Sequence, residues 1–237
     1  MILKHSASLE SASDLAFFSL KRTAAGWSVG SRGNRLATGF QIDRQGHVLI
    51  FRLISDDNRN RLTHSFLESM HQALHDLAIE KRPLVITGND EYFSVGADLN
   101  EIAELSGPGA YEFSKSGQML MNLVAQFPAS VTSAISGFCM GGGLDLALAC
   151  HQRIADPHAT FGHRGAALGL MTGWGGTQRL PRLIGKARAL QILAAAETIS
   201  AGEALRIGLV DRISDDPFAD AVRENQGLRL HASPLLL

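Results

Sequence analysis

The chain has few cysteines, few aromatic residues and almost no net charge. Of its 237 residues two are cysteines and 6% are aromatic, and the formal net charge is −1. This balance gives no electrostatic case for nucleic acid or an acidic membrane surface as a partner. Cys139 and Cys150 belong to no Cys-x-x-Cys or Cys/His pattern, so the sequence predicts no metal site built on them.

Long hydrophobic runs are also missing. No apolar run approaches the ~20 residues that a membrane span needs. The run at residues 15–20 is interrupted by Ser19, and no small-residue cleavage site follows it, so we expect no secretory signal. The expectation is a cytoplasmic protein with two reduced thiols, long enough for one α/β domain or at most two.

Strand-like and helix-like segments alternate along the chain, which indicates an α/β fold. Residues 1–40 show no sustained hydrophobic period and are predicted to be an N-terminal extension. Residues 41–215 form the predicted core domain, and residues 216–237 form a shortened C-terminal segment. Expected strands are 47–53, 83–87, 131–136, 153–155, 160–161 and 209–213, and expected helices are 62–77, 110–127, 141–150, 176–184, 187–196 and 201–208.

Two patterns that resemble cofactor or metal sites are incomplete. The glycines from Gly137 to Gly143 do not have the spacing of a dinucleotide fingerprint, and no acidic residue follows at the required distance. Glu68, His71 and His75 share one helical face, but this face points away from the apolar stripe. That arrangement is typical of a solvated surface, so no metal site is predicted.

Two glycine-containing loops each follow a predicted buried strand. The segment "FSVGAD" (93–98) follows the strand at 83–87, and Gly141-Gly-Gly143 opens a helix after the strand at 131–136. If these parallel strands are neighbours, both loops emerge at the sheet edge where α/β proteins usually bind ligands. Two backbone amides that converge on one carbonyl oxygen form an oxyanion hole, and a helix N-terminus adds to the field. For each loop alone, a tight turn without a ligand is the alternative.

Three ordered segments closely resemble the enoyl-CoA hydratase/isomerase (crotonase) family. They are "ITGNDEYFSVGADLNEI", "AISGFCMGGGLDLALACHQRIADPHATFG" and "GWGGTQRLPRLIGKARALQILAAAETISAGEALRIGLVDRI". The resemblance spans residues 48–213. It implies an α/β fold in which ββα turns spiral into two stacked sheets with surrounding helices, usually assembled as homotrimers or hexamers. It also implies an acyl-CoA thioester as substrate, with coenzyme A as part of that substrate and no separate cofactor.

The resemblance assigns roles to single residues of both loops. The oxyanion amides fall on Ala97 and on Gly142, with Gly141 beside it in the glycine run that would let a thioester oxygen approach the backbone. Residues 58–62 occupy the place of the family's adenine-side loop, a weaker match in which Arg59 or Arg61 would meet CoA phosphates. The residues expected to line the pantetheine entry are Asp98, Leu99 and Asn100.

The sequence departs from the family's hydratases at both catalytic carboxylates. Those hydratases use two glutamates that hold one water molecule and transfer protons. The first position is Asp145, which keeps the carboxylate but retracts it by about an ångström, a displacement that can cost ~100-fold in rate. The second position is Gly165, which has no side chain. The usual two-carboxylate hydration is therefore in doubt.

Three interpretations of this site stay open. In the first, Asp145 alone is the acid or base, as in the family's single-carboxylate double-bond isomerases. In the second, water or a small anion near His163 or Arg164 fills the space at Gly165. Bicarbonate does so in the family's dihydroxynaphthoyl-CoA synthases, but Thr172 stands where those enzymes have an aspartate. In the third, the site binds acyl-CoA and no longer catalyses efficiently.

We expect an acyl-CoA enzyme that stabilises a thioester enolate, with hydratase or double-bond isomerase chemistry. An acyl-CoA-binding protein with little or no catalysis is the alternative. Asp145 is the candidate acid or base, although an aspartate there could simply be a partner of the helix dipole. His163 is expected to be structural or to touch the acyl group, and Trp174 to shape the acyl pocket or pack beneath it. The apolar residues 234–237 are predicted to contact another subunit.

Overall fold

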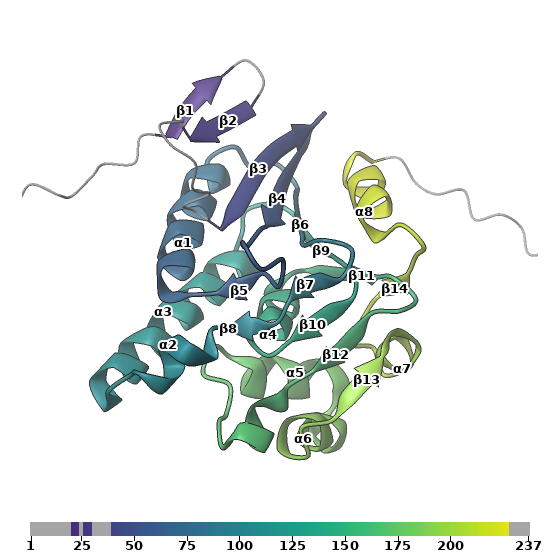
Figure 1. Ribbon diagram of the computed structural model, residues 1–237. Coiled ribbons are helices and arrows are strands. Elements are labelled where there is room, and N and C mark those ends of the chain that lie inside the picture. The colour runs from purple at the N-terminus through teal and green to yellow at the C-terminus, as the bar shows by residue number, and fades with distance from the viewer. Residues whose placement is uncertain (1–19, 24–25, 30–38, 228–237) are drawn as a thin grey trace, which may run out of the picture. The chain divides into compact units, whose positions relative to one another are not determined.

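The computed structural model describes residues 20–23, 26–29 and 39–227 (Figure 1). The chain divides into two compact units, residues 1–35 and 36–237. In the first unit, strands β1 (Leu20–Thr23) and β2 (Gly26–Val29) pair in antiparallel fashion. Most of the predicted N-terminal extension and the apolar residues 234–237 lie outside the described residues. Within the described ranges, no helix is long and apolar enough to cross a membrane.

The second unit contains a six-stranded sheet with the order β14-β11-β9-β6-β4-β3. Neighbouring strands run parallel, except that β3 is antiparallel to β4. The two strands that precede the predicted glycine loops, β6 and β9, are fully buried, as predicted, and they are adjacent, which is the condition for both loops to emerge at one sheet edge. The strand bounds are β3 Phe40–Gln45, β4 Val48–Leu53, β6 Leu84–Thr87, β9 Val131–Ile135, β11 Gln152–Ala155 and β14 Arg212–Ile213.

Two smaller sheets carry the segments that follow these strands. One has the order β13-β12-β10-β7, and the other pairs β5 with β8. Their bounds are β5 Arg61–Leu62, β7 Tyr92–Ser94, β8 Gly96–Ala97, β10 Phe138–Met140, β12 Thr160–Gly162 and β13 Thr198–Ser200. The expectation that residues 92–98 form only a loop is wrong, because β7 and β8 pair with β10 and β5. Segments of two or three residues are too short to show a hydrophobic period.

The helices form around these sheets, and most lie where the sequence predicts them. Helix α1 buries the apolar stripe of the predicted 62–77 helix, and it begins after Thr63, whose side chain accepts a hydrogen bond from the Phe66 amide. Helices α2 and α8 and the 3₁₀ helix η1 are additions to the expected helices. The bounds are α1 His64–Ala78, α2 Leu99–Ala103, α3 Gly107–Ala125, α4 Gly142–Ala149, η1 Arg164–Leu168, α5 Gly176–Ile184, α6 Lys186–Ala194, α7 Ala201–Arg206 and α8 Pro217–Asn225.

Helix α4 occupies the centre of this unit. Every one of its residues is buried, and it contacts α3 and α5 as well as strands β7, β8 and β10 (Figure 1). On the six-stranded sheet, α8 contributes Ala221 and Val222 to a cluster with Val48, Ile50 and Val85. The start of α4 therefore lies inside the packed body of the protein, next to the segment that contains β8.

Candidate active site

The two glycine loops lie against each other where β8 meets the start of α4. A Cβ atom added to Gly96 would come within 2.6 Å of the Gly142 amide nitrogen and 2.8 Å of the Met140 carbonyl oxygen. The φ angle of Gly96 is +91°, a backbone conformation that also favours glycine. Ala97, the next residue, lies opposite Leu62 in the parallel β5–β8 pair. The structure thus brings the segments of Ala97 and Gly142 together.

The start of α4 presents a free backbone donor. Gly141 has φ +53°, and its amide donates to the Gly162 carbonyl at 2.9 Å. Gly142 is the first residue of the helix, where an N–H group has no intrahelical acceptor. Among the described residues, the structure shows no acceptor for the Gly142 amide. This amide, at the positive end of the helix dipole, is suited to hold an anionic oxygen.

Asp145 lies on the first turn of α4 and is enclosed by other side chains. It is 1% exposed, and its Oδ1 is 3.2 Å from Nε2 of His163. The hydroxyl of Thr172 donates to its Oδ2. A Cβ atom on Gly176 would overlap Oδ1, so the start of α5 also lies against the carboxylate. These contacts hold the carboxylate in one position and satisfy both of its oxygens.

Charged and ionisable groups from two other elements face Asp145. Burial lowers the pKa of Arg179 on α5, and the negative charge of Asp145 partly opposes this effect. The Arg179 guanidinium donates to the Trp174 carbonyl at 3.1 Å and to Oδ1 of Asn122 at 2.8 Å. On β10, burial raises the pKa of the Cys139 thiol well above its usual value, with smaller contributions from Cys150 and Asp145. The charge of Asp145 therefore acts on one cation and one thiol, in addition to its contact with His163.

Trp174 packs directly beneath the glycine turn. Its side chain is buried, and its indole lies between Gly117 of α3 and Gly142 of α4, where added Cβ atoms would overlap the ring. It also meets Phe113 edge to face, with ring centroids 5.3 Å apart. The tryptophan therefore fixes the distance between the two helices beside the predicted oxyanion amide.

Gly165 lies in η1, and the turn that follows η1 folds back against it. Its carbonyl accepts a hydrogen bond from the Leu170 amide at 2.9 Å, and an added Cβ would come within 2.9 Å of the Leu170 carbonyl oxygen. The neighbouring Arg164 side chain is exposed, whereas His163 points inward to Asp145. The position that the resemblance matches with the second glutamate of the hydratases thus lies in a hydrogen-bonded turn.

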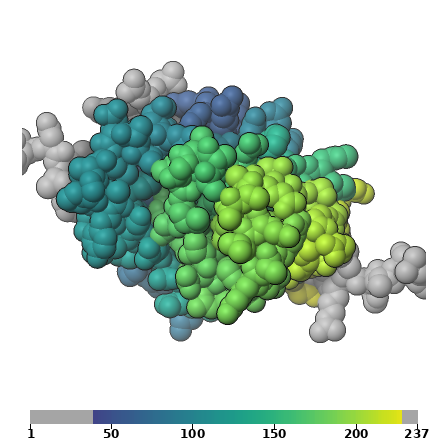
Figure 2. Space-filling view, turned by 90° about the horizontal axis from the view of Figure 1, so that it is seen from below, coloured from purple at the N-terminus to yellow at the C-terminus, as the bar shows by residue number. Residues whose placement is uncertain are grey.

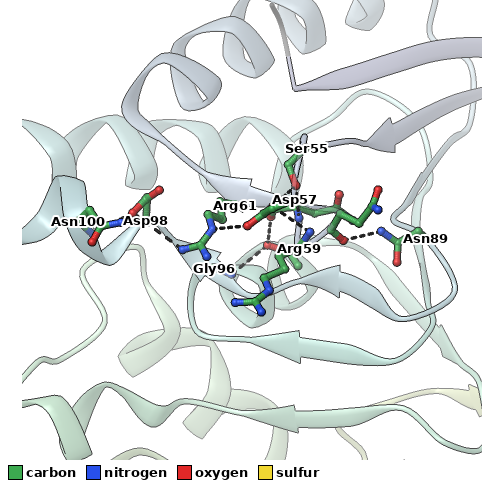
Figure 3. Close-up of polar contacts among 11 residues, drawn as sticks. Ser55, Asp57, Arg59, Arg61, Asn89, Gly96, Asp98 and Asn100 are labelled. Atoms are coloured by element: carbon green, nitrogen blue, oxygen red, sulfur yellow. Dashed lines mark hydrogen bonds and ion pairs between the residues drawn. The ribbon is translucent and has the colours of Figure 1, made fainter. Parts of the chain in front are cut away.

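The residues predicted for the pantetheine entry cluster at the start of α2 (Figure 3). Asp98 caps this helix by accepting a hydrogen bond from the Asn100 amide at 2.8 Å. Leu99 is 48% exposed, and the Asn100 side chain is also exposed. Figure 3 shows the Arg61 guanidinium between two carboxylates, 2.7 Å from Asp57 and 4.0 Å from Asp98. The three predicted residues thus share one exposed edge.

The loop before β5 is held together by a network that sequence reasoning missed. Oδ1 of Asp57 accepts from the Ser55 hydroxyl at 2.7 Å and from the Arg59 amide at 3.1 Å. Burial would raise the pKa of Asp57, but these bonds and that from Arg61 outweigh burial and lower it to about 2. Of the two arginines proposed for CoA phosphates, Arg61 is therefore engaged in ion pairs, whereas Arg59 has an exposed side chain with no ion pair to any described residue.

Thr172 stands where related enzymes have an aspartate, but the sequence did not predict the contact of Thr172 with Asp145. The two residues are 27 positions apart, and no motif spacing links them. The contact depends on how the segment between η1 and α5 folds back onto α4. No group of three or more His, Cys, Asp and Glu side chains that could hold a metal ion exists in the part of the chain that the structure describes.

Solved structures define the class of fold. The chain superposes on an enoyl-CoA hydratase from Bacillus anthracis with a TM-score of 0.76 and 32% identity, covering 81% of this chain and 76% of that one. For DspI of Pseudomonas aeruginosa the TM-score is 0.78 with 30% identity, covering 87% and 79%. The sheets, the helices around them and the buried helix after the glycine turn are therefore those of the crotonase fold, as predicted.

Sequence comparison then identifies the family. Residues 43–228 match the model described as Enoyl-CoA hydratase/isomerase, and the chain belongs to this family. A probable enoyl-CoA hydratase of Bacillus subtilis is 40% identical over 154 residues, which are 64% of this chain and 60% of the relative. A crotonyl-CoA hydratase of Syntrophomonas wolfei is 45% identical over 131 residues, 55% of this chain and 50% of the relative. The matched segments thus span 50–60% of the length of these two relatives.

Proposed function

We propose that the protein is an enzyme that acts on an acyl-CoA thioester and stabilises an enolate oxygen with the amides of Ala97 and Gly142. The observation that carries this proposal is the contact of the Gly96–Ala97 segment with the unpartnered Gly142 amide. Backbone donors preorganised in this way are worth ~3–4 kcal/mol each in similar sites. The names of the relatives, which are CoA hydratases, support the substrate class.

In this proposal Asp145 is the proton carrier. It takes a proton from the carbon next to the thioester carbonyl, and the electron pair of the broken C–H bond moves into an enolate held by the two amides. For isomerisation, Asp145 returns the proton to the γ carbon of the former double bond, or the same steps run in reverse. One carboxylate suffices for this shuttle. Hydration needs a second group to activate water, and Gly165 supplies none, so we favour double-bond isomerisation or a specialised hydration.

The second candidate function is acyl-CoA binding with little turnover. One observation favours it specifically: Asp145 is 1% exposed, and both of its oxygens already have partners, His163 and Thr172. A carboxylate whose two oxygens are engaged in this way is less accessible to a substrate than an open one. The two candidates share the same site and differ in whether Asp145 reaches the acyl chain.

Incubation with crotonyl-CoA and with a 3-enoyl-CoA distinguishes them. We expect turnover of at least one substrate, and a loss of about 10²–10⁴-fold in Asp145→Asn with acyl-CoA binding retained, because proton transfer is removed but the amides remain. Asp90→Asn, an exposed aspartate with no side-chain hydrogen bond or ion pair to any described residue, is the control. Binding without turnover in the unmodified protein would favour the second candidate, and full activity of Asp145→Asn would remove Asp145 from the mechanism.

We also propose that the chain assembles as a homotrimer or hexamer. Several apolar side chains on the second unit are well exposed, and such surface is usually covered in an assembly. The examples around η1 and α6 are Leu168 at 59%, Met171 at 59% and Leu190 at 65%. Light scattering coupled to gel filtration tests this proposal, and a monomeric mass at micromolar concentration would contradict it. The cytoplasmic location stays a prediction.

A further inference from the structure

A polar cavity of about 490 Å³ lies beside α3 and the start of α5. In Figure 2 the teal surface of α3 borders the green surface that includes α5. Two arginines, two amide side chains and two hydroxyls are among the groups that line it: Gln118, Asn122, Thr172, Thr177, Arg179 and Arg182. The polar lining means that water fills this space readily.

Thr172 links this cavity with the buried carboxylate of Asp145. It lines the cavity, and its hydroxyl donates to Oδ2 of Asp145. Asp145 itself is 1% exposed and does not line the cavity. Among the described residues that do line it, Thr172 is the one for which the structure shows a hydrogen bond to Asp145. The Thr172 hydroxyl is therefore a hydrogen-bonded connection between the carboxylate and a space that water can enter.

Bound substrate would make this connection important. In the proposed function an acyl thioester is seated against the Gly142 amide, on the same first helical turn as Asp145, and a closed site of this kind excludes water. The other contacts that the structure shows for this carboxylate are Nε2 of His163 at 3.2 Å and the start of α5 at Gly176, and the Arg179 guanidinium interacts with its charge. The arginine does not release its proton near neutral pH. Thr172 is the neighbour that offers both a hydroxyl and contact with water.

We propose that Asp145 exchanges protons with solvent through the Thr172 hydroxyl and the polar cavity. In this step a proton taken up from solvent arrives at Oγ1 of Thr172 while the hydroxyl proton of Thr172 passes to Oδ2 of Asp145. The hydroxyl is regenerated, the carboxylate becomes the acid, and no electrons are transferred. The reverse step returns the proton to solvent. Thr172 thus acts through Asp145: its hydroxyl positions the carboxylate and passes protons to it, and it does not touch the substrate. Its part in turnover rests on the proposed function.

Deuterium transfer during turnover tests this route. In D₂O, an enzyme whose Asp145 exchanges with solvent places deuterium in the product, whereas one that cannot exchange returns the substrate's own hydrogen. We expect Thr172→Val to incorporate at least about threefold less deuterium per turnover, and its kcat to fall about tenfold with KM within twofold. Thr172→Ser, which restores the hydroxyl, should behave as the unmodified protein. Equal deuterium incorporation in Thr172→Val and the unmodified protein would overturn the proposal.

Thr177→Val is the matched control. Thr177 lines the same cavity, but its hydroxyl contacts Gln178 at 3.5 Å and makes no hydrogen bond to Asp145. The same substitution there should leave deuterium incorporation unchanged. Circular dichroism and thermal unfolding show whether each variant folds, and Thr172→Ala is the second hydroxyl-free variant if Thr172→Val does not. A loss of incorporation in Thr177→Val equal to that in Thr172→Val would overturn the assignment to Thr172.

A measurement without acyl-CoA separates this inference from the proposed function. The infrared difference between the unmodified protein and Asp145→Asn isolates the carboxylate bands of Asp145. Loss of a hydrogen bond to the carboxylate shifts these bands, so we expect a shift in Thr172→Val and none in Thr177→Val. If the unmodified protein turns over no acyl-CoA, the proposed function fails. The carboxylate bands of Asp145 then test the hydrogen bond from Thr172 on their own. A shift then supports the link between Thr172 and Asp145, and unchanged bands overturn it.

Discussion

The six-membered ring of Trp174 lies against the Cα atom of Gly142, so closely that a methyl group at Gly142 would overlap the ring. The same indole lies against Gly117 on its other side. Position 142 therefore serves two purposes: a helix start with a free amide, and a flat surface on which a tryptophan packs. The absence of a side chain at the predicted oxyanion residue is required by packing as well as by access for a ligand.

Gly142→Ala should destabilise the protein. The added methyl group forces the buried Trp174 to move, and overpacking of this kind typically costs ~1–3 kcal/mol. Urea unfolding followed by circular dichroism measures the change in the free energy of unfolding. Gly202→Ala is the control, because nothing lies within 4 Å of a Cβ added to Gly202 in α7. That substitution should be neutral or stabilise by about 0.4–1 kcal/mol. Equal losses in both variants would contradict this explanation.

Much of this architecture could be predicted from the sequence because it depends on local periodicity. The helical spacing of apolar residues in α1 and the short apolar runs of β6 and β9 can each be recognised within the segment itself, without knowledge of its partners. The adjacency of β6 and β9, which places the two glycine loops near each other, was only a condition in the sequence analysis, because the rules of parallel sheets give the edge at which the loops emerge and not the order of the strands. Strands β5, β7, β8, β10 and β13 were missed, because a segment of two or three residues depends largely on its partners to become a strand, although the equally short β12 was predicted at 160–161.

Asp57→Asn should weaken the loop before β5 in a pH-dependent manner. The pKa of Asp57 is lowered to about 2, below its usual value, so its contribution to stability is complete above about pH 4 and is lost as the pH falls toward 2. Because the Asp57 side chain is 40% exposed, the effect is small, about 1–3 °C in Tm near pH 7. Thermal unfolding of both proteins from pH 2 to pH 7 should show their Tm values converging at low pH.

The neighbouring aspartate provides the comparison for this loop. Asp56 is exposed, and the structure shows no hydrogen bond or ion pair from its side chain to the described residues. Asp56→Asn removes the same charge at nearly the same place, so it should change the Tm little at any pH. The Tm of Asp57→Asn and that of the unmodified protein should differ less as the pH falls. If the difference stays constant down to pH 2, the ionised carboxylate of Asp57 is not the cause of that difference.

Both thiols should resist modification in the folded protein. Burial raises the pKa of Cys150 to about 12 and that of Cys139 well above its usual value, so the reactive thiolate is scarce at neutral pH. We expect labelling by a thiol reagent at pH 8 to be at least about 100-fold slower than for a free cysteine. In urea, both cysteines of the chain should react quickly. Fast labelling of the native protein would mean that β10 or the end of α4 opens readily.

The site itself could be predicted only in part. The first turn of α4 places Asp145 near Gly142 from helical spacing alone, so that relation is local. The partners His163 and Thr172 reach the carboxylate from segments 18 and 27 positions away. The positions of these two side chains depend on the fold of η1 and of the turn after it, and these segments show no hydrophobic period in the sequence. The sequence therefore indicated Asp145 as the candidate acid or base, but it did not indicate the two residues that hold its carboxylate in place.

Gly165→Glu, which supplies the family's second glutamate, should not create an efficient two-carboxylate hydratase. The Cβ atom of any side chain at this position would come within 2.9 Å of the Leu170 carbonyl oxygen, and the Gly165 carbonyl is bonded to the Leu170 amide. The turn must therefore shift to admit a glutamate. We expect a loss of ~1–3 kcal/mol in the free energy of unfolding, measured with urea, and no gain in hydration of crotonyl-CoA.

Ala167→Glu makes the matched comparison, because Ala167 is exposed in the same 3₁₀ helix and gains the same side chain. It should change stability by less than about 0.5 kcal/mol. A rise in crotonyl-CoA hydration in Gly165→Glu, with stability unchanged, would mean that the turn from Gly165 to Leu170 adapts freely. The missing carboxylate, and not the hydrogen-bonded turn, would then be the obstacle to hydration at this position.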